Sequence, residues 1–113
     1  MRRVTASEIV IGDTTWRAPI AVMANGVLDS WQAPPLEKLS IEDLAPLLAG
    51  GAEIIVIGTG REQQLPHREL MFAMARNGVG LEMMDTAAAA RTFNVLLGEG
   101  RPVAAVLYVG AGC

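Results

Sequence analysis

The second half of the chain alternates between apolar runs and longer stretches with helical spacing, and this alternation restricts the possible folds most. The pattern predicts strands over residues 53–57, 79–84 and 102–108, separated by helices over 66–76 and 86–98. Strands that alternate with helices of this length are joined by right-handed crossovers and lie parallel in one sheet, with helices covering its faces. The sequence therefore predicts an α/β domain.

The first half of the chain predicts shorter strands separated by turns. Residues 8–11 and 14–17 predict a hairpin, and residues 19–23 predict a further strand that ends at the turn Asn25-Gly26. We expect these antiparallel strands to make the central sheet a mixed one. The expected fold is one three-layer α/β domain over residues 1–113, with antiparallel N-terminal strands followed by β-α-β-α-β.

Prolines shape the segment between these halves. Pro34-Pro35, after Trp31, predicts a loop, because a proline pair excludes both a helix and a central strand. Ser40 and Asp43 resemble a capping box and predict a short helix that starts at Ser40. Pro46 requires that this helix is kinked or begins nearer Pro46.

Composition excludes several functional classes. A net charge of −3 gives no general attraction to nucleic acid. The longest apolar runs, such as residues 54–57, are far shorter than the roughly 20 residues that span a bilayer, so we expect no membrane insertion. His67 and Cys113 are the only histidine and cysteine, which leaves too few ligands for a transition-metal site. With no signal-peptide pattern after Met1, the expected location is the cytoplasm.

Gly58-Thr59-Gly60 directly follows a predicted buried strand. Closely spaced glycines free backbone N–H groups to hold an anion, and ligand sites of α/β proteins lie at the carboxyl ends of strands. The dinucleotide-binding fingerprint is broken, because Gln63 stands where the third glycine is required and the next helix starts only at Pro66. The loop is therefore either a tight structural turn or a ligand-holding nest.

The helix predicted over 66–76 carries the single histidine. On a helical wheel, His67 falls on the apolar side, which favours a partly buried packing residue over a catalytic base. That side is formed by Leu70, Met71 and Met74. Phe72 falls toward the charged side, where it would suit a partner interface or lie under a loop.

The main functional signal is a set of polar residues in and around the helix over 86–98. The predicted core side of this helix comprises Ala89, Phe93, Leu96 and Leu97. Arg91 and Asn94 lie on the opposite face and form either a solvated surface or a contact surface. The residues Glu82, Arg91, Glu99 and Arg101 could meet as ion pairs around the two helix ends. No nucleophile and base stand in a recognisable arrangement, so we expect no catalytic residue and no cofactor.

Three stretches resemble a known family: "VIGTG" at 56–60, "GLEMMDTAAAARTFNVLLGEGR" at 80–101 and "VAAVLY" at 103–108. They are similar to uncharacterised bacterial and archaeal proteins with an MTH-like α/β domain, a family that includes assembly factors of mitochondrial respiratory complex I. The resemblance implies a three-layer fold with a mixed sheet. For the mitochondrial branch it implies a non-enzymatic helper that binds another assembly factor and early complex I subunits. Because no mitochondrial transit peptide is recognisable, we expect a bacterial member.

Three functional hypotheses follow. The first is a protein-binding assembly helper without a cofactor. The second is a domain that binds a small anion or metabolite through Gly58-Thr59-Gly60 and a nearby arginine, with weak enzymatic activity as an extension. The third is a structural homodimer, with the Phe72 surface or the Trp31 loop at the contact. We expect the chain to be either a monomer or a weak homodimer. The candidate binding residues are Gly58, Thr59, Gly60, Glu82, Arg91, Thr92, Asn94, Glu99 and Arg101.

Overall fold

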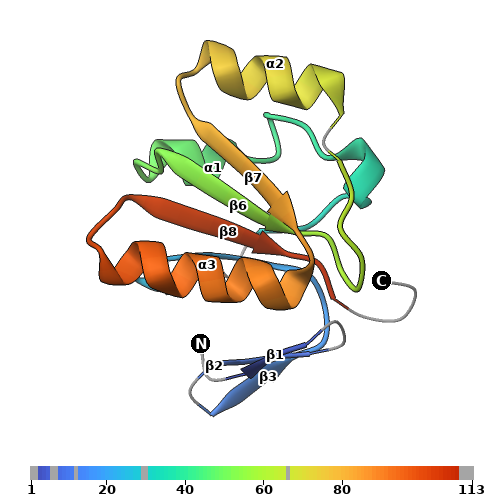
Figure 1. Cartoon of the computed structure of the whole chain (residues 1–113), viewed down its shortest axis with the longest axis vertical. Coiled ribbons are helices and arrows are strands. Elements are labelled where there is room, and N and C mark those ends of the chain that lie inside the picture. Colours follow the sequence, from blue (N-terminus) through green and yellow to red (C-terminus); the bar gives the residue numbers. More distant parts are fainter. Residues whose placement is uncertain (1–2, 6–7, 12, 29–30, 66, 110–113) are drawn as a thin grey trace.

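The computed structural model of the chain describes residues 3–5, 8–11, 13–28, 31–65 and 67–109. Its centre is a five-stranded sheet with the strand order β5-β4-β8-β6-β7 (Figure 1). These strands are β4 (Ile20–Met23), β5 (Gly26–Val27), β6 (Ile54–Gly58), β7 (Gly80–Met84) and β8 (Val103–Leu107). β6 is parallel to β7 and β8, whereas β4 is antiparallel to β5 and β8. The predicted mixed sheet is confirmed.

The connections between the parallel strands explain the three layers. β6 leads through α2 (Arg68–Arg76) to its neighbour β7, and β7 returns through α3 (Thr86–Gly98), past β6, to β8. Right-handed crossovers that run in opposite directions across a sheet place their helices on opposite faces. α3 has 13 residues and is the longest helix in the described part of the chain. A bilayer requires about 20 residues, so no described helix could cross a membrane.

Two apolar cores fill the space on the two sides of the sheet. Alternate strand residues such as Ile55 and Ile57 face Leu70 and Met74 of α2 on one side. Val56, between them in sequence, faces Ala89 and Phe93 of α3 on the other. This alternation is the period of two expected of strands buried on both faces.

The N-terminal strands correct one detail of the expected sheet. β1 (Arg3–Val4), β2 (Ile9–Ile11) and β3 (Thr14–Trp16) form a separate antiparallel sheet. They cannot extend the central sheet beside β4, because β5 and β8 already occupy its two sides. The hairpin instead buries Ile9 and packs Trp16 in the same core as α3, next to that helix (Figure 1).

The segment before β6 corrects the predicted helix start. A short 3-10 helix, η1 (Leu36–Lys38), precedes α1 (Ala45–Ala49). The Asp43 carboxylate accepts hydrogen bonds from the Ser40 N–H at 3.0 Å and the Ser40 hydroxyl at 2.9 Å. These bonds close a turn rather than a helix. α1 begins at Ala45, so that Pro46 lies in its first turn, where the missing N–H has no partner to lose.

α2 differs from its prediction in its first residue and in the exposure of Met71, which was predicted to lie on the apolar side. Pro66, the predicted first helical residue, lies outside the described residues, and α2 begins after His67. The buried residues of α2 are Leu70, Ala73 and Met74, whereas Met71 is 47% exposed. The helix is rotated toward Ala73, which moves Met71 from the apolar side to the flank.

Candidate functional site

The loop Gly58-Thr59-Gly60 is buried at the carboxyl end of β6. The Thr59 N–H donates to the Met84 carbonyl at 2.8 Å, and the Gly60 N–H donates to Thr86 Oγ1 at 2.8 Å. Both amides that a phosphate would require are therefore engaged within the protein. The arrangement has the hydrogen bonding of a tight structural turn, the first of the two interpretations of this loop.

Thr86 joins this loop to the end of β8. Its hydroxyl donates to the Tyr108 carbonyl at 2.6 Å and accepts from Gly60, while its own N–H donates to the Gly60 carbonyl at 2.8 Å. A Cβ on Gly58 would lie 2.8 Å from Thr86 Cα. Gly58, the first glycine of "VIGTG", therefore permits the start of α3 to approach the end of β6. Gly60, the second, has a φ of +97° and makes the turn.

The other candidate residues do not converge on one pocket. Glu82 lies on β7, and Arg91 and Asn94 lie on the exposed side of α3. Glu99 and Arg101 are also exposed but follow α3, at the amino-terminal edge of the parallel strands, opposite the Gly58 loop. Within the described residues, no ion pair joins Glu82, Arg91, Glu99 and Arg101.

Thr92 connects α3 to the end strand of the sheet. Its hydroxyl lies 3.3 Å from Met84 Sδ, a weak hydrogen bond to β7. Val95 follows about one turn later, nearer the solvent side of the helix, and is 60% exposed. α3 thus presents an apolar side chain to solvent next to the turn that contacts β7.

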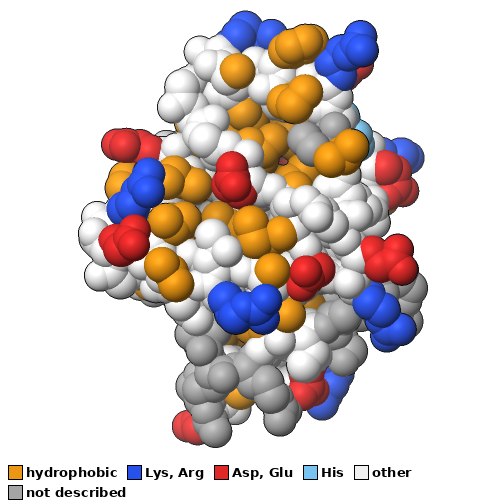
Figure 2. Space-filling view, in the orientation of Figure 1, with side chains coloured by type: hydrophobic (Ala, Val, Ile, Leu, Met, Phe, Trp, Pro, Cys, Tyr) orange, Lys and Arg blue, Asp and Glu red, His pale blue; other side chains and the backbone are white. Residues whose placement is uncertain are grey.

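Exposed apolar side chains are also present on and before α2. Leu65, before α2, is 85% exposed, and the neighbouring Met71 and Phe72 on α2 are 47% and 52% exposed. Figure 2 shows hydrophobic side chains on this face of the molecule, from α2 across β7 to α3, with an acidic side chain among them. We call this surface, formed by Leu65, Met71, Phe72, Val95 and the strand β7, the β7 surface. On α2, Met71 lies on the flank toward β7, and Phe72 lies on the outer side of the helix. Phe72 is exposed, as its wheel position predicted, and its role in a partner interface stays a prediction.

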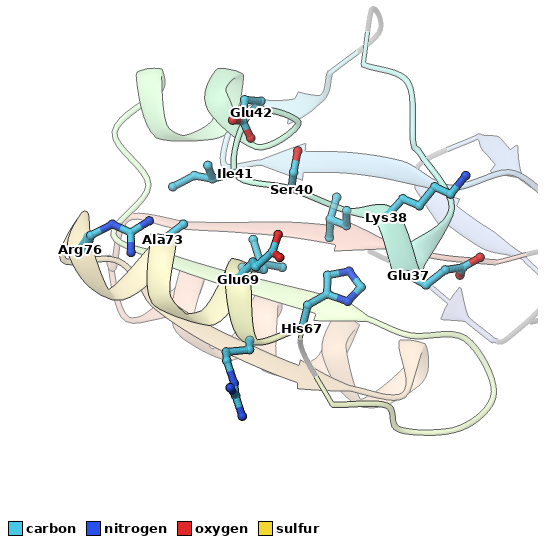
Figure 3. Close-up of a pocket in the computed structure, with 12 residues that line it drawn as sticks. Glu37, Lys38, Ser40, Ile41, Glu42, His67, Glu69, Ala73 and Arg76 are labelled. Atoms are coloured by element: carbon cyan, nitrogen blue, oxygen red, sulfur yellow. The ribbon is translucent and has the colours of Figure 1, made fainter.

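A groove that sequence reasoning missed lies on the other flank of α2. It has a volume of about 560 Å³ and separates α2 from the segment 37–42. Figure 3 shows Glu37, Lys38 and Glu42 along one wall and Glu69 and Arg76 along the other. Leu39, Leu70 and Ala73 contribute its buried apolar part. No sequence motif indicated this groove, because its two walls lie far apart in the chain.

His67 lies at the end of this groove, between α2 and the segment that contains Glu37 (Figure 3). The residue is partly buried, which agrees with the packing interpretation. Its Nε2 atom is buried and has no hydrogen-bond partner among the described residues. The described residues contain no cluster of three or more His, Cys, Asp or Glu side chains that could hold a metal ion.

Among the titratable residues that the structure describes, Tyr108 has a clearly shifted pKa. Burial raises the pKa of its phenol well above the ordinary value, and the carboxylates of Asp43 and Glu37 raise it further. The hydroxyl donates to the Pro34 carbonyl at 2.8 Å. Tyr108 therefore remains protonated into the alkaline range, and its hydrogen bond to Pro34 holds the proline loop against the sheet.

Comparison with known proteins places this geometry in a family. A zebrafish protein named NADH dehydrogenase [ubiquinone] 1 alpha subcomplex assembly factor 3 is 33% identical over 99 residues, which cover 86% of this chain and 56% of the relative. This chain thus spans little more than half of that protein. An uncharacterised protein of Rhodobacter capsulatus is 43% identical over 98 residues, covering 85% of this chain and 78% of the relative.

A solved structure and a family model extend these matches. The NMR structure of a Xanthomonas campestris protein has a TM-score of 0.88 and 33% identity, and the match covers 99% of this chain and 85% of that one. The model of the family described as "Protein of unknown function (DUF498/DUF598)" matches residues 1–108. Because the family model matches nearly the whole sequence, this chain belongs to the DUF498/DUF598 family.

Proposed function

We propose that this chain is a non-enzymatic protein-binding domain that assists the assembly of a protein complex. The observation that carries the proposal is the β7 surface, which exposes Leu65, Met71, Phe72 and Val95. Large apolar side chains gathered on one face of a domain are typical of protein contact sites. The names of the assembly-factor relatives support the same class of function.

Arg91 and Asn94 extend the proposed contact area along α3. Both are exposed and lie on the same side of the helix, one turn apart, with Val95 next to Asn94. Arginine beside exposed apolar groups suits an interface, because its guanidinium combines a charge with planar contact area. The buried Gly58-Thr59-Gly60 loop donates hydrogen bonds to Met84 of β7 and Thr86 of α3. It is not part of the proposed contact.

Site-specific photo-crosslinking in the host cell tests the proposal. A photoreactive amino acid would replace Phe72 in one variant and Val95 in another, and Ala49, exposed on α1, would serve as the control position. We expect Phe72 and Val95 to yield an adduct with the same protein and Ala49 to yield none. Equal adducts from all three positions, or none from Phe72 and Val95, would overturn the proposal.

Arg91→Ala separates binding from stability in the same assay. Because Arg91 is exposed, its removal should change the free energy of unfolding by no more than about 0.5 kcal/mol. The yield of the adduct from Val95 should fall. A large loss of stability with an unchanged adduct would assign Arg91 to the fold instead of the interface.

A further inference from the structure

We propose that the open edge of β7 binds an extended segment of a partner protein as an additional strand of the central sheet, with a lysine or arginine of that segment beside Glu82. The proposal rests on the protein-binding function above and specifies how the partner is held. Addition of a strand to an open sheet edge combines backbone hydrogen bonds with side-chain specificity.

The backbone of β7 has hydrogen-bonding groups directed away from the sheet. The Gly80 N–H donates to the Glu53 carbonyl at 2.9 Å, and the Met84 carbonyl accepts from Thr59, so Gly80 and Met84 face β6. Backbone groups alternate in direction along a strand, which points those of Leu81 and Met83 outward. In the described part of the chain, β7 has a neighbouring strand only on its β6 side.

One of these outward groups already has a partner, and the others define the available edge. Gln63 Nε2 donates to the Met83 carbonyl at 3.2 Å. The Leu81 N–H, the Leu81 carbonyl and the Met83 N–H have no hydrogen-bond partner outside β6 in the part of the chain that the structure describes, and they remain along the open side. An incoming strand could pair with these three groups without displacing Gln63.

Apolar side chains flank this edge on both faces of the sheet. Thr92 contacts Met84 and therefore lies on the α3 flank beside β7, and the exposed Val95 follows one turn later, nearer the solvent side of the helix. On α2, Glu69 and Ala73 face the groove at segment 37–42, and helical geometry places Met71 on the opposite, β7 flank. A strand added to β7 would therefore meet the Thr92 flank of α3, with Val95 at its outer margin, on one face and Met71 on the other.

Glu82 determines which kind of strand fits. Its side chain is exposed, on the α3 side of the edge, and forms no ion pair with a described residue. Adjacent strands bring side chains of the same face within about 5 to 8 Å, where opposite charges attract and like charges repel. A basic residue of the added strand would complement Glu82.

The same charge disfavours a second copy of this chain as the occupant. Antiparallel pairing of two β7 strands through Leu81 and Met83 sets the two Glu82 side chains directly opposite or diagonal on one face. Charged residues on edge strands are a common device against such self-pairing. Glu82 therefore favours a heterologous, basic segment.

Selection from a phage-displayed library of short random peptides tests this mode of binding with the full chain. We expect the selected peptides to alternate apolar residues around a lysine or arginine and to slow hydrogen exchange at the Leu81 and Met83 amides. Glu82→Lys should weaken their binding by about fivefold or more, and Glu82→Gln by less. Glu42→Lys makes the same charge change on the exposed groove wall and should leave their affinity unchanged.

The alternative outcomes distinguish this inference from the proposed function. Peptides that slow exchange only around the groove at segment 37–42, or that bind Glu82→Lys as tightly as the wild type, would overturn strand addition and leave protein binding intact. Failure to select any peptide, together with a crosslinked partner at Phe72 and Val95, would do the same. Failure of both selection and crosslinking would overturn both proposals.

Discussion

At the scale of single residues, Thr86 connects the parts of the chain that meet at the carboxyl edge of the sheet. Its buried hydroxyl accepts a hydrogen bond from the Gly60 N–H and donates one to the Tyr108 carbonyl, which links the turn after β6 to the end of β8. Buried backbone groups that lose such a partner retain the full cost of their removal from water. The residues of this network stabilise the fold and are inaccessible to a partner.

Thr86→Val should lower the free energy of unfolding by about 1–3 kcal/mol, because the shape is preserved while Gly60 N–H and Tyr108 C=O lose their partner. Thr92→Val is the matched control on the same helix. Its hydroxyl contacts only a thioether sulfur, so its loss should cost less than about 0.5 kcal/mol. Urea denaturation measures both, and equal values would contradict the assigned role of Thr86.

Gly58→Ala should also destabilise the fold, by about 1–3 kcal/mol, because the added methyl group would overlap the backbone at Thr86. Gly98→Ala is the control and should not destabilise the fold. Gly98 is helical, and a Cβ added there would meet no neighbouring atom within 4 Å. That change should stabilise by about 0.5 kcal/mol. Thermal unfolding compares them, and a tolerated Gly58→Ala would show that the helix start can shift.

At the scale of elements, α3 has a structural side and an exposed side. Ala89 and Phe93 are buried against the sheet, whereas Arg91, Asn94 and Val95 are exposed. Its amino terminus is fixed by Asp85, whose carboxylate accepts a hydrogen bond from the Ala88 N–H at 3.0 Å. The orientation of the exposed side therefore depends on the capped first turn.

Asp85→Ala should cost about 1 kcal/mol of stability, the usual effect of removing an N-cap side chain. Asp85→Asn should restore most of this loss, because asparagine caps helices about as well. Chemical denaturation monitored by circular dichroism would compare the variants. If alanine and asparagine destabilise equally, the charge of Asp85, rather than its hydrogen bond, is the important property.

At the scale of the whole molecule, long-range contacts attach the connecting loop to the sheet. Tyr108, at the end of β8, donates to the Pro34 carbonyl, and Trp31 Nε1 donates to the Asp43 carbonyl at 2.7 Å. The loop thereby covers the core between the sheet and α2, and its residues 37–42 form the wall of the charged groove that faces α2. The two sides of α2 differ for this reason: one faces the groove and the other belongs to the β7 surface.

The raised pKa of Tyr108 predicts a loss of stability in alkali. The folded state holds the phenolic proton more tightly than the unfolded state, so this contribution is complete below about pH 10, the unfolded value. It decreases as pH rises toward the folded pKa. Tyr108→Phe should flatten this decline in urea-unfolding measurements at several pH values.

Absorbance provides an independent check, because Tyr108 is the only tyrosine of the chain. Tyrosinate absorbance of the folded protein should appear only well above the pH at which free tyrosine ionises. Titration at the ordinary pH, with the protein still folded, would contradict the buried hydrogen bond to Pro34.

Much of the fold could be predicted from the sequence, because local patterns carry the relevant physics. The apolar periodicity in the second half predicted the β6-α2-β7-α3-β8 order. The turn predicted at Asn25-Gly26 lies one residue earlier, at Ala24-Asn25, because Gly26 pairs with Met23 and begins β5, a strand that the sequence did not predict. The helical wheel of α3 separated Phe93 from Arg91 correctly. Each of these features depends on neighbours within a few residues along the chain.

Only the tertiary structure decided where the polar and apolar side chains meet. The sequence could not show that Thr86 uses the amide of Gly60, since a glycine-rich turn has the same local pattern with or without a bound anion. It also could not identify β7 as the edge strand or place segment 37–42 opposite α2. Strand order and loop packing depend on contacts between residues distant in the chain, whose free energies no local pattern encodes.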